Sequence, residues 1–351
     1  MKNDNYENSL LETIRKLLNL VFVLVIIIAL LPFVLLNLDA NGEFFESDST
    51  PKVAATTPIN TETSTGVTSI YWAPPSFEQI TDLKKLDLVF YGKELIEHTA
   101  KFLGPKGNVS SLTNGQNCQN CHLEGGTKIF GNNYGAVAST YPKMRARSGT
   151  KESIQKRVND CFERSLNGKP LKNNSLEMRS IVAYIQFLGS NIPKGGKAEG
   201  SGLKDLRFLE RAADPVKGKP LYEAKCASCH QSNGEGTRNP DGVEYSFPPL
   251  WGSHSFNDGA GLYRLTNMAR YVKYNMPFGV SHDQPSLSDE EAWDISAYII
   301  SMPRPHKNTP TDWPDISKKP IDHPFGPYAD KFTEKQHKYG PFTAIKEFYK
   351  K

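Results

Sequence analysis

A short pattern that occurs twice constrains this chain most strongly: CQNCH at residues 118–122 and CASCH at residues 226–230. Two cysteines separated by two residues and followed at once by histidine are the attachment signature of a c-type haem. A redox Cys-x-x-Cys pair or a disulfide leaves the repeated histidine unexplained, and neither motif has a second cysteine pair nearby to complete a zinc site. We therefore predict two covalently bound haem c groups, with attachment residues Cys118, Cys121, Cys226 and Cys229 and axial ligands His122 and His230.

The surroundings of the two motifs repeat as well. Apolar residues at helical spacing occupy 86–103 before the first motif, and 214–225 begins a helix that runs into the second. Each motif is followed by a Gly/Pro-rich stretch and a closing helix, predicted at 174–189 and 288–302. An opening helix, a haem motif, loops and a closing helix describe a small cytochrome c domain. We predict an all-α fold with two class I cytochrome c-like domains in tandem.

The ends of the closing helices carry recognisable signals. Asn174 and Glu177 are expected to form a capping pair at the start of the first closing helix, and Gly189 to end that helix. Ser288 and Glu291 have the spacing of a capping box for the second.

The N-terminus has a different character. Residues 17–38 are mostly apolar and uncharged, and a helix of this length covers the roughly 30 Å hydrocarbon core of a bilayer. Arg15 and Lys16 precede the span and acidic residues follow it, so the positive-inside rule places the rest of the chain outside the cytoplasm. We predict a single-pass anchor in the cytoplasmic membrane with periplasmic haem domains. The alternative is a cleaved signal peptide and a soluble periplasmic protein.

These patterns divide the chain into segments. The predicted segments are a cytoplasmic tail (1–16), the membrane anchor (17–38), a flexible Thr/Ser/Pro-rich tether (39–75), the first haem domain (76–195), a linker (196–213), the second haem domain (214–303) and a C-terminal extension (304–351). The formal net charge of +4 is mild, and no basic run of the kind that tracks phosphates occurs, so we expect no nucleic-acid partner.

The second axial ligand sets the chemistry of each haem. In the second domain Met276 lies in a loop, YNMPFG, between predicted helices. Met268 falls within a helix predicted at 260–274 and Met302 ends the closing helix, so both are expected to pack. We predict His230/Met276 ligation, which raises the reduction potential. His254 and His282 are the alternative ligands.

The first domain lacks such a loop but contains the fifth cysteine, Cys161. The segment 151–166 has helical periodicity, and Cys161 falls at the edge of its apolar stripe, with Arg157 and Ser165 one turn away on the same face. A buried cysteine often only fills space. An unpaired cysteine in an oxidising compartment is nevertheless a liability unless it is occupied. Iron would occupy it as a thiolate, and Arg157 favours that form.

The chain resembles the tetrathionate-forming thiosulfate dehydrogenases, dihaem cytochromes c of bacterial sulfur metabolism, over roughly residues 86–345. The resemblance extends well beyond the haem motifs. It is carried by YGKELIEHTAKFLGPKG (91–107), NCQNCHLEGGTKIFGNNYGA (117–136), RARSG (145–149), RVNDCFERSLNGKPL (157–171), FPPLWG (247–252), NMPFG (275–279) and HKYGPF (337–342).

This resemblance implies that the chain joins two thiosulfate ions into tetrathionate and releases two electrons. It implies that Cys161 is the distal ligand of the active-site haem opposite His122, and that Arg147, Arg157 and Ser165 form the substrate pocket. Some members place a lysine immediately before the methionine ligand. Asn275 occupies that position here, which favours plain His230/Met276 ligation.

Other functions remain open at this stage. A dihaem cytochrome that only transfers electrons in a respiratory chain would use Cys161 as a static ligand, and a dihaem peroxidase would need a displaceable His/Met site instead. The direction of the reaction is also open, because the same site would serve tetrathionate reduction. An external electron acceptor, such as a small cytochrome c or a redox complex, is the expected partner.

Overall fold

In the computed structural model the chain divides into two units, Met1–Gly66 and Val67–Lys351. The structure describes residues 16–17 and 70–350. All but Leu17 of the predicted anchor at 17–38, and most of the predicted tether at 39–75, therefore lie outside the described residues. None of the helices in the described part of the chain has the length and hydropathy of a membrane span.

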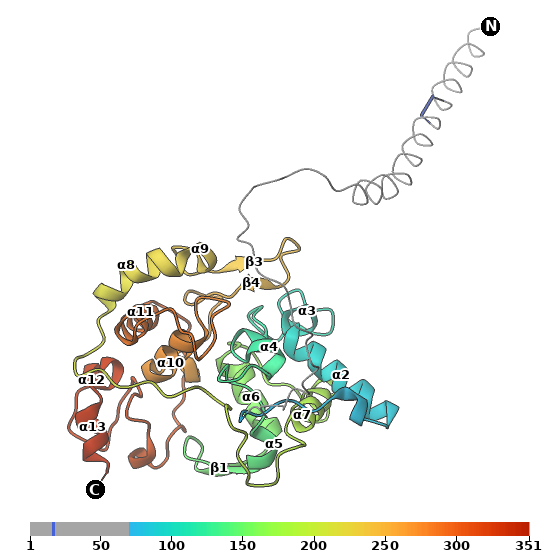
Figure 1. Ribbon diagram of the computed structural model, residues 1–351, viewed down its shortest axis with the longest axis horizontal. Helices are drawn as coiled ribbons and strands as arrows, with labels where there is room; N and C mark the ends of the chain where they lie inside the picture. The colour runs from blue at the N-terminus through green and yellow to red at the C-terminus, as the bar shows by residue number, and fades with distance from the viewer. Residues whose placement is uncertain (1–15, 18–69, 351) are drawn as a thin grey trace, which may run out of the picture. The chain divides into compact units, whose positions relative to one another are not determined.

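The first half of the second unit is built mainly of helices (Figure 1). Its elements are the 3-10 turn η1 (Phe77–Gln79), α2 (Leu83–Glu97), α3 (Thr99–Leu103), η2 (Cys118–Asn120), α4 (Leu123–Gly126), α5 (Val137–Thr140), β1 (Lys143–Arg145), β2 (Thr150–Glu152), α6 (Ile154–Arg164) and α7 (Leu176–Leu188).

The second half repeats the order of opening helix, motif and closing helix. Its elements are α8 (Pro215–Lys225), α9 (Ala227–His230), β3 (Thr237–Arg238), β4 (Tyr245–Phe247), η3 (Gly261–Tyr263), α10 (Leu265–Asn275), α11 (Asp289–Ser301), η4 (Ile316–Lys318), α12 (Glu334–Tyr339) and α13 (Thr343–Phe348).

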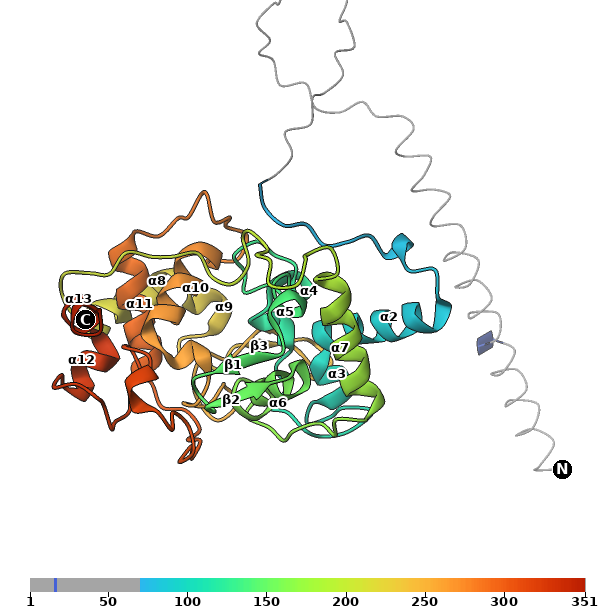
Figure 2. The same ribbon diagram turned by 90° about the horizontal axis from the view of Figure 1, so that it is seen from below.

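The opening and closing helices of each half cross at very short range. In the first half α2 packs on α7, and Figure 2 shows the two side by side. A Cβ added at Gly92 of α2 would lie 2.0 Å from the carbonyl oxygen of Ser180 in α7. In the second half α8 packs on α11, and a Cβ at Gly218 would lie 1.9 Å from the carbonyl oxygen of Asp294. Only glycine allows the backbones to approach so closely, so the same helix crossing is built twice.

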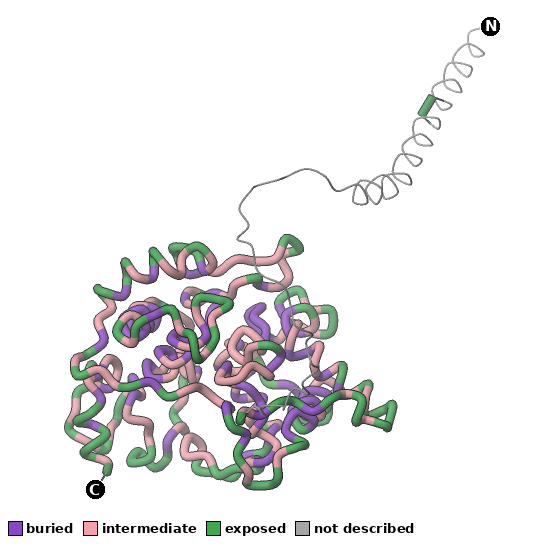
Figure 3. Tube along the Cα trace, in the orientation of Figure 1, coloured by how far each residue is buried: buried purple, intermediate pink, exposed green. Residues whose placement is uncertain are grey.

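Each half has its own cluster of buried side chains (Figure 3). The first cluster includes Leu95 of α2 and Ile181 of α7, and the second includes Trp293 of α11. Phe342 and Ile345, from the predicted C-terminal extension, are 2% and 0% exposed and belong to the second cluster. The extension is therefore an integral part of the second core.

The helix predicted at 86–103 is interrupted. His98 leaves the helical conformation, so α2 ends at Glu97 and α3 restarts at Thr99. The break is compensated by the residues beside the first haem motif. The Asn117 side chain accepts a hydrogen bond from the free backbone N–H of Ala100 (2.8 Å), and the Thr99 hydroxyl accepts one from the N–H of Cys118 (2.9 Å). Free N–H groups at a helix start require such partners.

Two other helix starts differ from the sequence prediction. Ser175, and not Asn174, caps α7 by accepting a hydrogen bond from the N–H of Met178, although Gly189 does end that helix. The segment that looked helical from residue 260 becomes the α-helix α10 only at Leu265. There the Asp322 carboxylate, from the C-terminal extension, accepts hydrogen bonds from the N–H and the hydroxyl of Thr266. The Ser288/Glu291 capping box is present as predicted.

The all-α prediction needs one addition. Within residues 70–350 there are two short antiparallel ribbons, β1 with β2 and β3 with β4, each pairing only two or three residues per strand. The ribbon β1–β2 leads directly into α6, so that the helix predicted at 151–166 begins at Ile154, where the Ser153 hydroxyl caps it.

The two halves are joined by several hydrogen bonds. The Asn114 amide donates to the carbonyl of Ser255 (3.0 Å), and the Gln116 amide donates to that of His254 (3.0 Å). Glu244, in the β3–β4 turn, accepts a hydrogen bond from the Asn117 amide at 2.9 Å. Three hydrogen bonds therefore connect the segment that leads into the first haem motif to the second half.

Candidate active site

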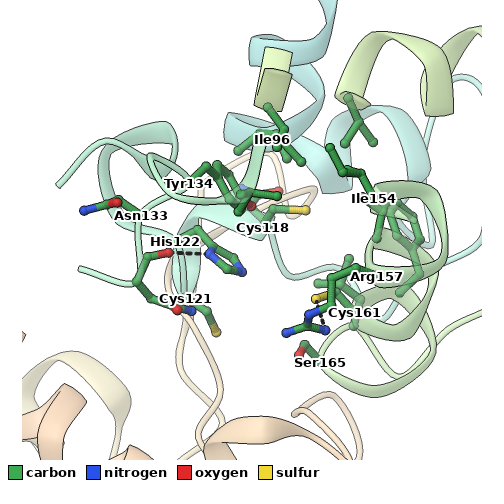
Figure 4. Close-up of a pocket in the computed structure, with 18 of the residues that line it drawn as sticks. Ile96, Cys118, Cys121, His122, Asn133, Tyr134, Ile154, Arg157, Cys161 and Ser165 are labelled. Carbon is green, nitrogen blue, oxygen red and sulfur yellow. Dashed lines mark hydrogen bonds between the residues drawn. The ribbon is translucent and has the colours of Figure 1, made fainter. Parts of the chain in front are cut away.

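The first haem motif forms one wall of a cavity between α2, α6 and α7. Cys118 and Cys121, in and after η2, line this cavity together with His122. The Nδ1 atom of His122 lies 2.6 Å from the carbonyl oxygen of Asn132. That hydrogen bond fixes the ring and leaves Nε2 as the atom available to a metal. In Figure 4 the His122 ring points across the cavity.

Burial sets the protonation state of this histidine. It lowers the pKa of His122 to about 4, against a weaker opposing effect of the Asn132 hydrogen bond. The imidazole is therefore neutral at neutral pH, which is the form that binds iron. The ring of Tyr134 stacks on that of His122 with centroids 4.5 Å apart and restrains it further.

The opposite wall of the cavity is α6. Arg157, Cys161 and Ser165 are spaced by one helical turn, and all three line the cavity, as their spacing predicted. Figure 4 shows Cys161 facing His122 across the space. Arg157 donates a hydrogen bond from Nη1 to Cys161 Sγ at 3.1 Å. The electrostatic interaction with Cys161 raises the pKa of Arg157 against the opposing effect of burial, so the guanidinium stays protonated.

The cysteines of the first motif have a different character from redox-active pairs. Burial raises the pKa values of Cys118 and Cys121 to about 12 each, whereas a catalytic Cys-x-x-Cys lowers the pKa of its thiol. Two neutral, inward-facing sulfurs, a neutral imidazole and a sulfur donor on the facing wall suit a covalently held haem with His/Cys axial ligands.

The second motif lines a second, larger cavity with Cys226, Cys229 and His230. The Nδ1 atom of His230 lies 2.8 Å from the carbonyl oxygen of Pro248, so that its Nε2 is also the free nitrogen. Burial lowers the pKa of His230. Met276, the C-cap of α10, lines the same cavity, whereas the alternative ligands His254 and His282 do not. This donor set suits a haem with His/Met ligands.

Arg147 lies apart from the other predicted substrate residues. It is not among the residues that line the first cavity. Its Nε lies 3.9 Å from a carboxylate oxygen of Asp312, whose other oxygen accepts a hydrogen bond from Arg164 at 2.9 Å. The Arg147 guanidinium also lies over the ring of Trp313, 5.5 Å from its centre. Burial, and then the charge of Arg164, lower the pKa of Arg147 to about 10.

Several of these neighbours could not be predicted from the sequence. Asp312 and Trp313 come from the C-terminal extension, far along the chain from Arg147 and Arg164, and no motif connects them. Tyr134 lies within a segment that carries the family resemblance, but its stacking on His122 becomes visible only in the fold.

Two family models match the chain. Residues 108–193 match the SoxA/TsdA cytochrome c domain, and residues 215–303 match cytochrome c. A thiosulfate dehydrogenase of Psychrobacter arcticus is 38% identical over 282 residues, covering 80% of this chain and 82% of that protein. One of Allochromatium vinosum is 41% identical over 202 residues, covering 56% of this chain and 73% of that protein.

A solved structure also matches. The thiosulfate dehydrogenase TsdBA from Marichromatium purpuratum, in its as-isolated form, has a TM-score of 0.62 and 30% sequence identity. The match covers 68% of this chain and 50% of that chain, so this protein corresponds to about half of the TsdBA chain.

The tandem domains and the two cavities define a c-type cytochrome with two covalently bound haems. Within that class, the chain belongs to the thiosulfate dehydrogenases, since it is 38% identical to a member along 82% of that member's length. The resemblance carried by the sequence motifs is thereby confirmed, as are the tandem cytochrome c domains.

Proposed function

We propose that this protein oxidises two thiosulfate ions to tetrathionate, with the first cavity as its active site. The observation that carries the proposal is the pairing of Cys161 with Arg157 on α6, directly across the cavity from His122. A protein sulfur beside a fixed positive charge suits a reaction that forms a sulfur–sulfur bond between anions. The names of the relatives support the same substrate.

Arg157 supplies the recognition of the substrate. Thiosulfate is a small dianion, and a guanidinium offers two parallel N–H donors for its oxygens. The Ser165 hydroxyl, one turn beyond Cys161, provides a further donor on the same wall. Arg147 contributes positive charge from outside the cavity, within electrostatic reach of Arg157.

Two covalent steps at the Cys161 sulfur account for the atoms and electrons of the reaction. Its thiolate and the outer sulfur of one thiosulfate lose two electrons and form a sulfur–sulfur bond, leaving a thiosulfonate on the cysteine. The outer sulfur of a second thiosulfate then attacks the adduct's sulfur that is bonded directly to the Cys161 sulfur, and the bond between these two sulfurs breaks. Tetrathionate is released, and the Cys161 thiolate is the leaving group, as in thiol–disulfide exchange. The same steps in reverse reduce tetrathionate.

Each bound haem supplies a site that takes up one electron, so the pair matches the two electrons released. Cys118, Cys121 and His122, with Cys161 opposite, would hold the first haem. Cys226, Cys229, His230 and Met276 would hold the second, whose thioether ligand raises its potential. Electrons would leave to an external acceptor, such as a small cytochrome c or a redox complex.

An anaerobic assay tests the proposal. Thiosulfate added to the oxidised holoprotein should reduce its haems, and tetrathionate should appear at half the amount of thiosulfate consumed. Haems that stay oxidised in thiosulfate, although a chemical reductant reduces them, would indicate a cytochrome that only transfers electrons. Haem reduction without tetrathionate would also contradict the proposed chemistry.

We also propose that residues 17–38 anchor the protein in the cytoplasmic membrane, with both haem domains in the periplasm. The apolar composition of the span and its flanking charges support this. The full-length protein should sediment with membranes and resist washing with high salt. A soluble periplasmic form that begins near residue 41 would show instead that the span is a cleaved signal peptide.

The division into haem domains at 76–195 and 214–303, separated by a linker at 196–213, is likewise a proposal. It is supported by the two separate clusters of buried side chains. The second cluster also includes Phe342 and Ile345 of the extension at 304–351. We therefore expect that the second domain does not fold without this extension.

A further inference from the structure

The two haem cavities share part of one wall. Gln116, Asn117 and Cys121, which belong to the first domain, line both cavities. Cys121 is itself an attachment residue of the first haem motif, so the covalent anchor of the first haem borders the space of the second. This wall therefore lies between the two haem sites.

Tyr271 connects the second cavity to this wall. It lies in α10, five residues before the Met276 ligand position, and lines the second cavity. Its side chain is buried, with 6% exposure, and its hydroxyl donates a hydrogen bond to the carbonyl oxygen of Asn120 at 2.8 Å. A buried tyrosine hydroxyl normally has such a partner. Here the partner is a carbonyl within the first haem motif.

Asn120 is the residue immediately before Cys121 in CQNCH. Its carbonyl belongs to the peptide bond that continues into the Cys121 backbone and side chain. A continuous path therefore leads from the Tyr271 ring through one hydrogen bond and a few covalent bonds to the sulfur of Cys121. Electronic coupling falls off less steeply through covalent and hydrogen bonds than across an open gap.

We propose that Tyr271 is the bridge through which electrons pass from the first haem to the second. One electron leaves the reduced first site and the oxidised second site is reduced, while the phenol keeps its proton and is not itself oxidised. The residue is thus a coupling residue and not a catalytic one. The proposal rests on the two haem sites and not on the identity of the substrate.

The association of the two halves does not depend on the hydrogen bond between Tyr271 and Asn120. The contacts of Asn114 with Ser255, Gln116 with His254 and Asn117 with Glu244 remain when the Tyr271 hydroxyl is removed. Tyr271→Phe keeps the ring that fills the space in the second cavity. Loss of one neutral hydrogen bond costs on the order of 1 kcal/mol of stability, so the variant should fold and bind both haems.

Tyr274 provides a matched control on the same helix. Its hydroxyl also donates to a backbone carbonyl, that of Asp205, at 3.0 Å. Asp205 belongs to the linker and not to a haem motif, so Tyr274→Phe removes a hydroxyl-to-carbonyl hydrogen bond of similar length, although a more exposed one, without touching the wall between the cavities.

The experiment measures electron transfer between the haems of the dihaem holoprotein, without thiosulfate. A flash of light on a flavin donor injects electrons, and absorbance follows their redistribution between the two spectrally distinct haems. Redistribution should be several-fold slower in Tyr271→Phe, slower still in Tyr271→Leu, and unchanged in Tyr274→Phe, with haem spectra and potentials as in the wild type.

Two results would overturn the proposal. One is a wild-type rate of electron redistribution in Tyr271→Phe, which would show that the Tyr271 hydrogen bond only stabilises the contact between the domains. The other is a rate change fully accounted for by a shifted potential of the second haem, which would make Tyr271 a tuning residue. Because the electrons come from flavin, failure here would leave thiosulfate oxidation untouched, and failure of the thiosulfate assay would leave this result standing.

Discussion

The Arg157 guanidinium lies 3.1 Å from the sulfur of Cys161, one turn away on the same helix. The pair is held on α6 by backbone geometry and not by a flexible loop, so its spacing is fixed before any ligand arrives. Arg157 is half-buried in the cavity wall, where its charge is partly withdrawn from water, and the cysteine sulfur is its hydrogen-bond partner. If iron or a substrate sulfur binds this sulfur, as we propose, the guanidinium would become available to substrate oxygens.

Replacing Arg157 should weaken thiosulfate use without removing either haem. A hydrogen bond to a charged group contributes about 1.5–3 kcal/mol, which corresponds to a loss of roughly ten- to a hundredfold in kcat/KM. Arg157→Lys keeps the charge but loses the two-pronged donor, so it should recover only part of that loss. Steady-state kinetics measures both variants. Equal activity of Arg157→Ala and wild type would remove Arg157 from substrate recognition.

Replacing Cys161 should instead abolish the chemistry. Cys161→Gly removes both the proposed iron ligand and the proposed carrier of the sulfur adduct, so the spectrum of the first haem should change and turnover should vanish. Mass spectrometry of the wild-type protein treated with tetrathionate should find a thiosulfonate on Cys161. Near-normal turnover of Cys161→Gly would leave the residue a packing cysteine.

Met276 should control the second haem alone. Met276→Gly removes the thioether that lines the second cavity, and loss of such a ligand lowers the reduction potential. A redox titration of the holoprotein should show one haem shifted downward and the other unchanged. Met268→Leu is the control, because Met268 lines the same cavity from within α10 and is 2% exposed. A shift in Met268→Leu but not in Met276→Gly would reverse the ligand assignment.

Local patterns in the sequence predicted the parts of the site that lie close together along the chain. The haem motifs, the α6 face with Arg157 and Cys161, and the helix order each depend on short spacings. The contacts of Arg147 with Asp312 and of Tyr271 with Asn120 join residues far apart in sequence, and packing of the two halves alone brings them together. The break at His98 was missed for a related reason, because its compensation comes from Asn117, beyond the helix itself.

The helix crossing in each haem domain should tolerate no side chain. Gly92→Ala would place a Cβ 2.0 Å from the Ser180 carbonyl, a backbone atom that can yield only if α2 and α7 separate. Overpacking of this kind costs about 1–3 kcal/mol or more, and denaturant unfolding should show that loss. Gly261→Ala is the control, because no atom lies within 4 Å of its Cβ position. Equal stability of the two variants would show that the crossing relaxes freely.

Asp312 is expected to hold Arg147 and Arg164 together, because it is the carboxylate that contacts both. Asp312→Asn keeps a hydrogen-bond acceptor but removes the counter-charge, and this lowers the pKa of Arg147 further below its wild-type value of about 10. Because the neutral form of arginine is the deprotonated one, Arg147 then loses its charge at a lower pH. The KM for thiosulfate, measured from neutral pH upward, should therefore begin to rise at a lower pH in Asp312→Asn than in the wild type. Asp315→Asn, an exposed neighbour that contacts Ser317 and Lys318, should leave the profile in place. If KM begins to rise at the same pH in Asp312→Asn as in the wild type, the C-terminal extension does not influence substrate binding through Asp312.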